Sequence, residues 1–261
     1  MTTTPRHLKI ATSIALLGVL LSLAPVAESA VNLISLRQEW QMREQLHSQV
    51  TAEHRVSEDR FLSALGQRLV SQTELGNMPW NFFVVQDSSA NAFNLPGGLV
   101  YVNSGLIAEA ESLDQLAGVL AHEIAHGTER HGTQLMTRSY GYGLLANLLL
   151  GKDPGMAKQL AAQIVGTGII TDYSRDAERT ADRLGVAYMV RSGYNPQGMV
   201  DFFGKLLDMR QRRPSKVEQF FSSHPMTEER IRIIQGEISR HSTGRLTHDT
   251  RDYQRFRSRY R

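Results

Sequence analysis

The sequence of 261 residues contains no cysteine. This absence excludes thiolate metal sites, disulfide frameworks and a lipoprotein anchor, because each of these needs a cysteine. A strong excess of one charge is also missing, since 29 basic and 26 acidic residues leave a net charge of +3. We therefore predict a chain that folds without disulfides, is not a lipoprotein and has no nucleic-acid partner.

A hydrophobic run that approaches membrane-spanning length occurs only near the start of the chain. Two basic residues precede an apolar run over residues 10–24, and small residues follow at 27–30. This pattern is typical of a secretory signal peptide cleaved after Ser29 or Ala30, with an uncleaved membrane anchor as the alternative. We expect residues 1–30 to be a signal peptide and the mature protein to be periplasmic.

The composition is that of an ordinary globular protein, with 41% hydrophobic and 21% charged residues. Hydrophobic periodicity predicts helices around residues 38–47, 58–70 and 199–209 and after Thr227, and strands over residues 81–85 and 98–102. We predict an α+β fold, with a mainly helical body and a small β-sheet. One domain is expected over residues 31–240, followed by a basic and aromatic tail over residues 241–261. Contact of the tail with anionic lipid and a solvated chain end are both open interpretations.

The most informative motif is His-Glu-x-x-His, formed by His122, Glu123 and His126. On an α-helix, residues four apart share a face, so the two imidazoles can bind a single Zn²⁺. The carboxylate between them then lies beside the metal and can act as a base. The pattern predicts a zinc hydrolase site on a helix.

The residues around the motif support such a helix. Ser112 followed by Gln115 predicts a capping box at its start, and apolar residues recur at helical spacing over residues 113–124. Gly132 is the predicted stop. We expect the small sheet to pack on this helix.

A zinc hydrolase needs a third protein ligand. His131 is close in sequence, but the extended zincin pattern, with glycine three residues and histidine six residues after the second motif histidine, is not met. Further along, a helix capped by Ser174 would place Glu178 and Asp182 on one face. Glu178 can supply the third ligand and Asp182 can accept the free ring N–H of a ligand histidine, whereas ordinary surface charge is the alternative.

Together these residues resemble the M48 family of zinc metallopeptidases, in the gluzincin group, and in particular its bacterial periplasmic branch concerned with outer-membrane quality control. Residues 91–106 resemble the strand-and-turn block that precedes the zinc helix in that family, and residues 223–230 resemble its late block. The resemblance covers about residues 38–238. Asn94 departs from it, because a small apolar residue is expected there. The tetratricopeptide array of longer members is absent from this sequence, so we expect a short, single-domain member.

The resemblance implies a zincin-like metallopeptidase domain that binds one Zn²⁺ per chain. His122, His126 and Glu178 would be the metal ligands, with Asp182 among the catalytic residues as the partner of a ligand histidine.

Two further catalytic residues follow from the chemistry and the resemblance. Glu123 is the expected general base, because it projects about 100° away from His122 around the helix and does not compete as a ligand. His224 is expected near the metal. It would either donate to the oxyanion that forms during peptide hydrolysis or occupy the open metal position as a removable fourth ligand.

An edge strand near Asn91 and Ala92 is predicted to bind an extended peptide by β-augmentation, which favours unfolded polypeptides. We predict a zinc-dependent endopeptidase that acts on misfolded or misassembled periplasmic and outer-membrane proteins, with the outer-membrane assembly machinery as a possible partner. A periplasmic chaperone or assembly factor with a latched zinc site is the alternative, and a zinc amidase shares the metal chemistry. The apolar residues 140–150 suggest peripheral membrane contact, a lid over the cleft or a core helix.

Overall fold

Short aromatic and β-branched runs form a mixed β-sheet in the computed structural model, which describes residues 32–139 and 173–261. The strands within these residues are β1 (Val56–Glu58), β2 (Asn81–Val85), β3 (Ala92–Leu95) and β4 (Leu99–Asn103). Their order is β1-β2-β4-β3; β2 and β4 are parallel, and the other two pairs are antiparallel. The strand β3 therefore lies at one edge of the sheet, as expected for the segment near Ala92.

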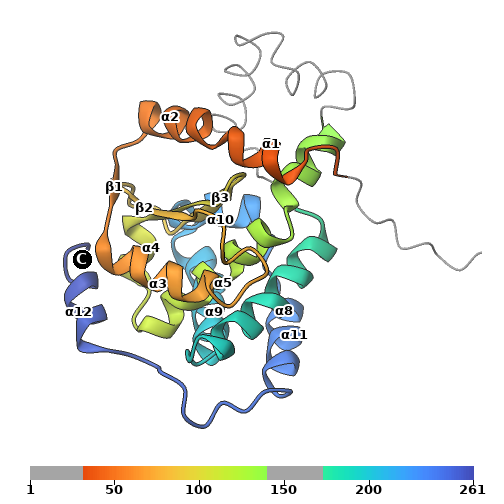
Figure 1. Cartoon of the computed structure of the whole chain (residues 1–261). Helices are drawn as coiled ribbons and strands as arrows, with labels where there is room; N and C mark the ends of the chain where they lie inside the picture. Colours follow the sequence, from red (N-terminus) through yellow and green to blue (C-terminus); the bar gives the residue numbers. More distant parts are fainter. Residues whose placement is uncertain (1–31, 140–172) are drawn as a thin grey trace, which may run out of the picture. The chain divides into compact units, whose positions relative to one another are not determined.

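Alternation along β2 and β4 divides the hydrophobic core between the two faces of the sheet. Phe82 and Val84 pack with helices α3 (Arg60–Val70) and α5 (Leu113–Thr128) on one face. Phe83 and Val85 belong to a second cluster, which α2 (Arg43–Glu53) covers after the short helix α1 (Leu36–Gln41). Figure 1 shows α2 and α5 on opposite sides of the sheet.

The body of the molecule is helical. Besides those four helices, the described residues form α4 (Ser104–Glu109), α8 (Arg175–Arg191), α9 (Gln197–Arg212), the 3₁₀ turn η1 (Pro214–Lys216), α10 (Glu218–Ser223), α11 (Glu228–Ile238) and α12 (Arg251–Arg257). Helix α5 lies at the centre and packs against α3, α8 and α9 (Figure 1). Its residues 113–127 are all buried, which is what a helix covered on every side requires. The predicted α+β fold, mainly helical with a small sheet on the motif helix, is confirmed.

Helix α5 begins where the sequence predicts, but its cap differs from the prediction. Ser112 is the N-cap residue, yet its side chain makes no cap hydrogen bond and its hydroxyl bonds the Asp114 carboxylate instead. The Gln115 side chain accepts from the amide of Glu111 rather than from that of Ser112. The predicted capping box is therefore wrong, because tertiary partners satisfy the first amides of this helix.

Those partners come from the C-terminal segment. The amide of Leu113 donates to the Asp249 carboxylate at 3.1 Å, and the amide of Asp114 donates to the carbonyl of His248 at 3.0 Å. A segment more than 130 residues away in sequence thus caps the motif helix.

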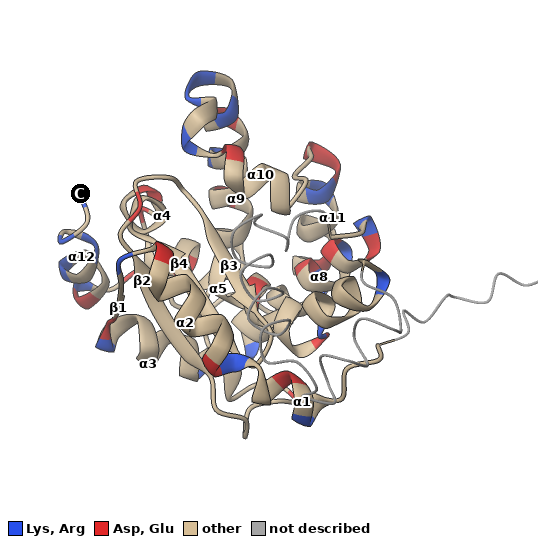
Figure 2. Ribbon diagram, turned by 90° about the horizontal axis from the view of Figure 1, so that it is seen from above, with Lys and Arg blue, Asp and Glu red and all other residues tan. Residues whose placement is uncertain are grey.

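The aromatic residues of the predicted tail, residues 241–261, pack on the body. Tyr253 and Phe256 of α12 are buried, and the Tyr253 hydroxyl donates to the carbonyl of Ala110 at 2.7 Å. Basic and acidic residues occur together on this helix (Figure 2), where Arg255 pairs with Asp252. Tyr253 and Phe256 are thus unavailable for the lipid contact considered from the sequence.

The end of α5 also differs from the prediction. The helix ends at Thr128 rather than at Gly132, and the residue with left-handed backbone geometry is Arg130, with φ of 58°. Helical geometry resumes over residues 131–139. Gly132 does not mark the end of the helix, because side-chain contacts of Arg130 stabilise the turn at an earlier position.

Most other elements lie close to their predicted positions. The strand over residues 81–85 is confirmed, the strand predicted over 98–102 is shifted by one residue, and Thr227 caps α11 as predicted. The helix predicted over residues 38–47 is wrong in its bounds, because two helices meet at Met42. Within the described residues no helix has the length and apolar character needed to cross a membrane. The predicted signal peptide and the apolar residues 140–150 lie outside the described residues.

Candidate metal centre

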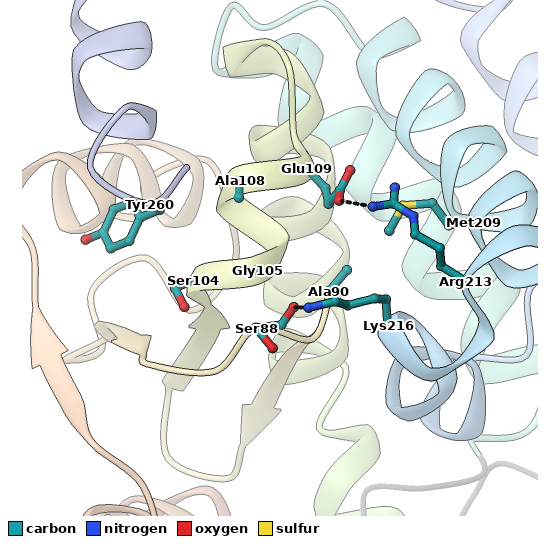
Figure 3. A pocket seen from close by; sticks show the side chains of 10 residues that line it. All are labelled: Ser88, Ala90, Ser104, Gly105, Ala108, Glu109, Met209, Arg213, Lys216 and Tyr260. Atoms are coloured by element: carbon teal, nitrogen blue, oxygen red, sulfur yellow. Dashed lines mark hydrogen bonds and ion pairs between the residues drawn. The ribbon is translucent and has the colours of Figure 1, made fainter.

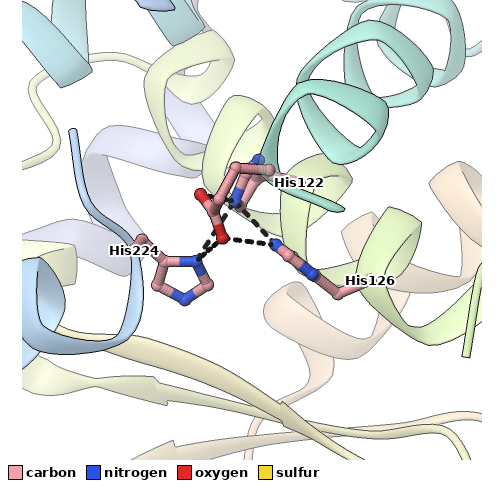
Figure 4. A group of neighbouring side chains, drawn as sticks. His122, His126 and His224 are labelled. Carbon is pink, nitrogen blue, oxygen red and sulfur yellow. Dashed lines mark hydrogen bonds and ion pairs between the residues drawn. The ribbon is translucent and has the colours of Figure 1, made fainter. Parts of the chain in front are cut away.

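Four side chains from three parts of the chain converge on one point. His122 and His126 come from α5, Glu178 from the first turn of α8 and His224 from the residue after α10. One donor atom of each lies within 4.8 Å of the other three, and all four residues are buried. Figure 4 shows the three imidazoles turned toward one another. Nitrogen and oxygen donors at these distances form a group that can hold a metal ion.

The individual distances show how tightly the group is drawn together. Nε2 of His126 lies 3.1 Å from Nε2 of His122 and 3.3 Å from Oε1 of Glu178. Nδ1 of His224 lies 3.1 Å from the same carboxylate oxygen and 3.3 Å from Nε2 of His122. The nitrogen that each histidine directs at the group is therefore defined: Nε2 for His122 and His126, and Nδ1 for His224.

Local sequence explains how Glu178 reaches the group. Ser174 caps α8, and its side chain accepts a hydrogen bond from the amide of Ala177 at 3.2 Å, as predicted. Gly185 allows α8 to approach α5 closely, since a Cβ atom there would lie 3.3 Å from the amide nitrogen of His122. The lack of a side chain at this position brings Glu178 and Asp182 up to the motif helix.

His122 is oriented by a carboxylate and an arginine. Nδ1 of His122 lies 3.1 Å from Oδ1 of Asp182, the contact expected from the sequence. Arg230 of α11 grips Asp182 with two hydrogen bonds, from Nε at 2.8 Å and from Nη2 at 2.7 Å, and also pairs with Glu178. A planar guanidinium suits this two-point contact. Sequence reasoning placed Arg230 in the late block but found no role for it, because no short-range spacing links α11 to α8.

His126 is held by a different set of groups. Its Nδ1 lies 3.0 Å from Nδ1 of His131, and the ring of Tyr173 stacks on it with centroids 4.0 Å apart. Burial lowers the pKa of His131 to about 4, so this imidazole is neutral. His131, the alternative third ligand, thus lies behind His126 and outside the donor group. For Nε2 of His126 to present a lone pair to a metal, its Nδ1 would carry the proton and donate to His131.

Glu123 lies beside the group without a firm partner. Among the described residues, neither of its carboxylate oxygens makes a hydrogen bond, and Nε2 of His224 is 3.3 Å from Oε1. Burial raises the pKa of this carboxyl, and the nearby histidines oppose the shift. A buried, weakly partnered carboxylate next to a donor group is what a general base requires.

The comparisons with known proteins address this site. The family model described as peptidase family M48 matches residues 57–238. The chain belongs to peptidase family M48. The matched residues include the whole donor group with Glu123 and Asp182, and the family predicted from the sequence is confirmed.

Several curated proteins are similar to this M48 chain. The beta-barrel assembly-enhancing protease of Escherichia coli is 33% identical over 225 residues, which cover 80% of this chain and 46% of that protein. The metalloprotease YcaL of Escherichia coli is 31% identical over 186 residues, or 68% of this chain and 71% of that protein. The mitochondrial metalloendopeptidase OMA1 of Schizosaccharomyces pombe is 28% identical over 189 residues, which cover 72% of this chain and 56% of that protein. The chain spans less than half the length of the first of these relatives. All three names agree with the predicted enzyme class, a metalloprotease.

The predicted substrate segment of this M48 chain lies on β3, an edge strand of the sheet that the described residues form. Asn91 and Ala92 are buried, and the carbonyl of Asn91 accepts from the amide of Asn103 at 2.9 Å, which extends the β3–β4 pairing by one residue. The Asn91 side-chain oxygen has no hydrogen-bond partner among the described residues. Strand β3 also packs directly on α5. The edge strand therefore runs beside the helix that carries the motif.

Asn94, the departure from the family pattern, lies in the middle of β3. Its side chain is buried and donates to the carbonyl of Leu99 at 3.5 Å. A Cβ atom at Gly127 would lie 3.0 Å from the side-chain nitrogen Nδ2 of Asn94. A glycine on the facing helix therefore makes room for the larger polar side chain.

A pocket of about 260 Å³ is lined by the residues that Figure 3 labels, among them Glu109, Arg213 and Lys216. Its charged side chains already have partners: Arg213 pairs with Glu109 at 3.4 Å, and Lys216 donates to the carbonyl of Ser88 at 3.1 Å. None of the residues of the metal centre lines it. This pocket is therefore separate from the donor group.

Proposed function

We propose that this chain is a zinc-dependent endopeptidase that hydrolyses misfolded or misassembled proteins of the periplasm and outer membrane. The observation that carries the proposal is the buried donor group of His122, His126 and Glu178 with the weakly partnered carboxylate of Glu123 beside it. Two imidazoles and one carboxylate, without any cysteine, fit zinc in a hydrolytic site.

When bound, zinc would act as a Lewis acid and lower the pKa of a water molecule to about 7. Glu123 would act as the general base, taking a proton from the attacking water and giving it to the amine that leaves, a role that suits a carboxyl whose pKa is raised by burial. Asp182 and His131 fix the ring orientations of His122 and His126.

The edge strand β3 is proposed to bind the substrate. An extended peptide that pairs with the outer edge of β3 near Asn91 and Ala92 would lie along α5 and pass the donor group. Backbone pairing of this kind accepts many sequences but needs an unpaired strand, so unfolded or extended polypeptides are the substrates of choice. The name of the beta-barrel assembly-enhancing relative supports a role near the outer-membrane assembly machinery. Export by residues 1–30 and a periplasmic location belong to the same proposal.

The alternative is a chaperone or assembly factor with a latched site. It is favoured by one observation: Nδ1 of His224 lies among the donor atoms, 3.1 Å from Oε1 of Glu178, where it would be a fourth ligand of a metal held by the other three. A chaperone role would survive the loss of Glu123, whereas a protease role would not.

The test is casein degradation by the mature protein, with zinc content measured alongside. We expect the wild type and Glu123→Gln to bind about one zinc each and only the wild type to cleave casein, with activity lost by about 10²-fold or more in the variant. Glu129→Gln, an exposed position one residue beyond α5, is the matched control and should behave as the wild type. Zinc binding without cleavage by any of the three proteins would support the chaperone, and absence of zinc from all three would overturn the metal site.

A further inference from the structure

A short segment near the start of the described residues binds the turn that follows the motif helix. The side-chain amide of Asn32 donates to the Thr133 hydroxyl at 2.7 Å, and the Arg130 guanidinium donates to the carbonyl of Ile34. These contacts join residues about a hundred positions apart in sequence. The turn after α5 is thus held by the N-terminal segment as well as by hydrogen bonds to its own sequence neighbours.

Glu39 is the centre of these contacts. It is only 2% exposed, and its carboxylate accepts from Nε of Arg130 at 2.7 Å. The same carboxylate receives the Thr133 hydroxyl and the amide of Gly97, each at 3.4 Å. Nothing about helix α1 requires a buried carboxylate, since the capping of that helix uses Ser35 and Gln38. The buried carboxylate of Glu39 instead serves as an acceptor for groups outside α1.

Arg130 has a backbone conformation that residues other than glycine rarely adopt. Its φ of 58° lies in the left-handed region, and it is the single residue other than glycine with positive φ among those described. Such a conformation persists when surrounding contacts over-determine it, and the pairing with Glu39 supplies such a contact. The turn at Arg130 determines where the next residue, His131, is placed.

His131 in turn faces a metal ligand. Its Nδ1 lies 3.0 Å from Nδ1 of His126, whose Nε2 points at the donor group. A partner on the second ring nitrogen of a ligand histidine determines the tautomer and the direction of the lone pair that binds metal. Glu39, Arg130, His131 and His126 therefore form one continuous series of contacts that ends at the metal centre.

We infer that Glu39 is a positioning residue for the metal centre, which acts through Arg130 and His131 to hold His126 in its metal-binding orientation. The inference rests on the proposed zinc site and adds a determinant of metal affinity that lies outside the motif. Zinc affinity should then depend on a residue more than 80 positions upstream of the ligand it serves.

The test measures the zinc dissociation constant of the full mature chain by competition with a chromophoric chelator, together with the visible absorption of the Co²⁺-loaded protein. For His131→Ala we expect a dissociation constant raised about 10- to 100-fold, as for other partners of metal-bound histidines, and for Glu39→Gln about tenfold. The Co²⁺ bands should shift in both. In the His131→Ala background, Glu39→Gln should cause no further loss, because the route to the metal is already broken.

A second variant distinguishes a loss of zinc affinity from a failure to fold. Glu39→Gln combined with Arg130→Gly leaves no unpaired charge, and glycine suits the left-handed turn, so this chain should fold and still bind zinc about tenfold more weakly. Asp59→Asn is the matched control: it removes the 2.8 Å pairing of a mostly buried carboxylate with Arg259 and keeps the capping oxygen of α3, so zinc affinity should be unchanged.

Zinc affinity within twofold of the wild type in the folded double variant would overturn the inference while leaving the proposed protease intact. An equal loss from Glu39→Gln with and without His131 would also overturn it, because Glu39 would then act on stability alone. Absence of zinc from the wild type would instead remove the proposed function.

Discussion

At the level of single residues, the two histidines of the motif are each oriented by a second side chain outside the donor group. Asp182 lies against His122 and is itself gripped by Arg230, whereas His131 lies against His126. His224 has no such dedicated partner, because both of its ring nitrogens face the site, one toward Glu178 and the other toward Glu123. Removal of His224 therefore leaves His122 held by Asp182 and His126 held by His131.

His224→Ala should open the fourth position. Because the imidazole then no longer fills the place that a water molecule needs, we expect casein cleavage to rise several-fold while the zinc dissociation constant rises about tenfold through the lost donor. Initial rates and chelator competition measure the two effects. His54→Ala, at an exposed position, is the control. If cleavage falls instead while zinc remains bound, His224 stabilises the oxyanion and is not a latch.

At the level of elements, α5 is a helix packed so closely that glycines set its contacts. A Cβ atom at Gly118 would lie 2.8 Å from the Cα of Met199 on α9. A Cβ atom at Gly198 would lie 2.5 Å from the carbonyl carbon of Asp114. The crossing of α5 and α9 at this separation places Phe203 of α9 edge-on to the ring of His122, with centroids 5.7 Å apart.

Gly198→Ala and Gly204→Ala, both on α9, should therefore act in opposite directions. The first forces two backbones apart and should lower the free energy of unfolding by about 1–3 kcal/mol. A Cβ atom at Gly204 meets nothing within 4 Å, so alanine there should raise it by about 0.5–1 kcal/mol through helix propensity. Urea titration followed by circular dichroism measures both. Equal effects of the two substitutions would contradict the close crossing.

At the level of the whole molecule, segments from both ends of the described chain secure the motif helix. Glu39 holds the turn beyond its C-terminal end, and Asp249 and His248 accept hydrogen bonds from its first two amides. Between them, the donor group joins α5, α8 and the residue after α10. Metal binding should therefore stabilise the whole domain, since these elements meet only in the folded state.

Removal of metal should lower the melting temperature. With free zinc at about 100 times its dissociation constant, the linkage contributes about 2.7 kcal/mol, which corresponds to a shift of about 5–10 °C for a domain of this size. Scanning calorimetry of zinc-loaded and chelator-treated protein measures the shift, and zinc added back should restore it. Glu178→Gln, which lacks a ligand, should show a smaller shift. A melting temperature that is independent of zinc in the wild type would contradict the expected coupling.

The sequence by itself determined the features that depend on neighbours along the chain. The spacing of His122 and His126 on one helix face, the cap of α8 by Ser174 and the strand over residues 81–85 all follow from local geometry. The family and the fold class could be predicted for the same reason, because the motif blocks are short and ordered along the chain.

Only the tertiary structure decided what acts across large sequence separations. The side chain of Asp249 replaces the predicted capping box, Arg130 rather than a glycine makes the turn after α5, and Arg230 holds Asp182 from another helix. His131, weighed as a ligand, lies behind His126 instead. His131 is only five residues from His126, but the turn that places it there depends on contacts of Arg130 with residues far away in sequence. Propensity and spacing carry no information about such distant contacts, because their partners are tens to more than a hundred residues apart and meet only when the helices and the sheet pack around α5.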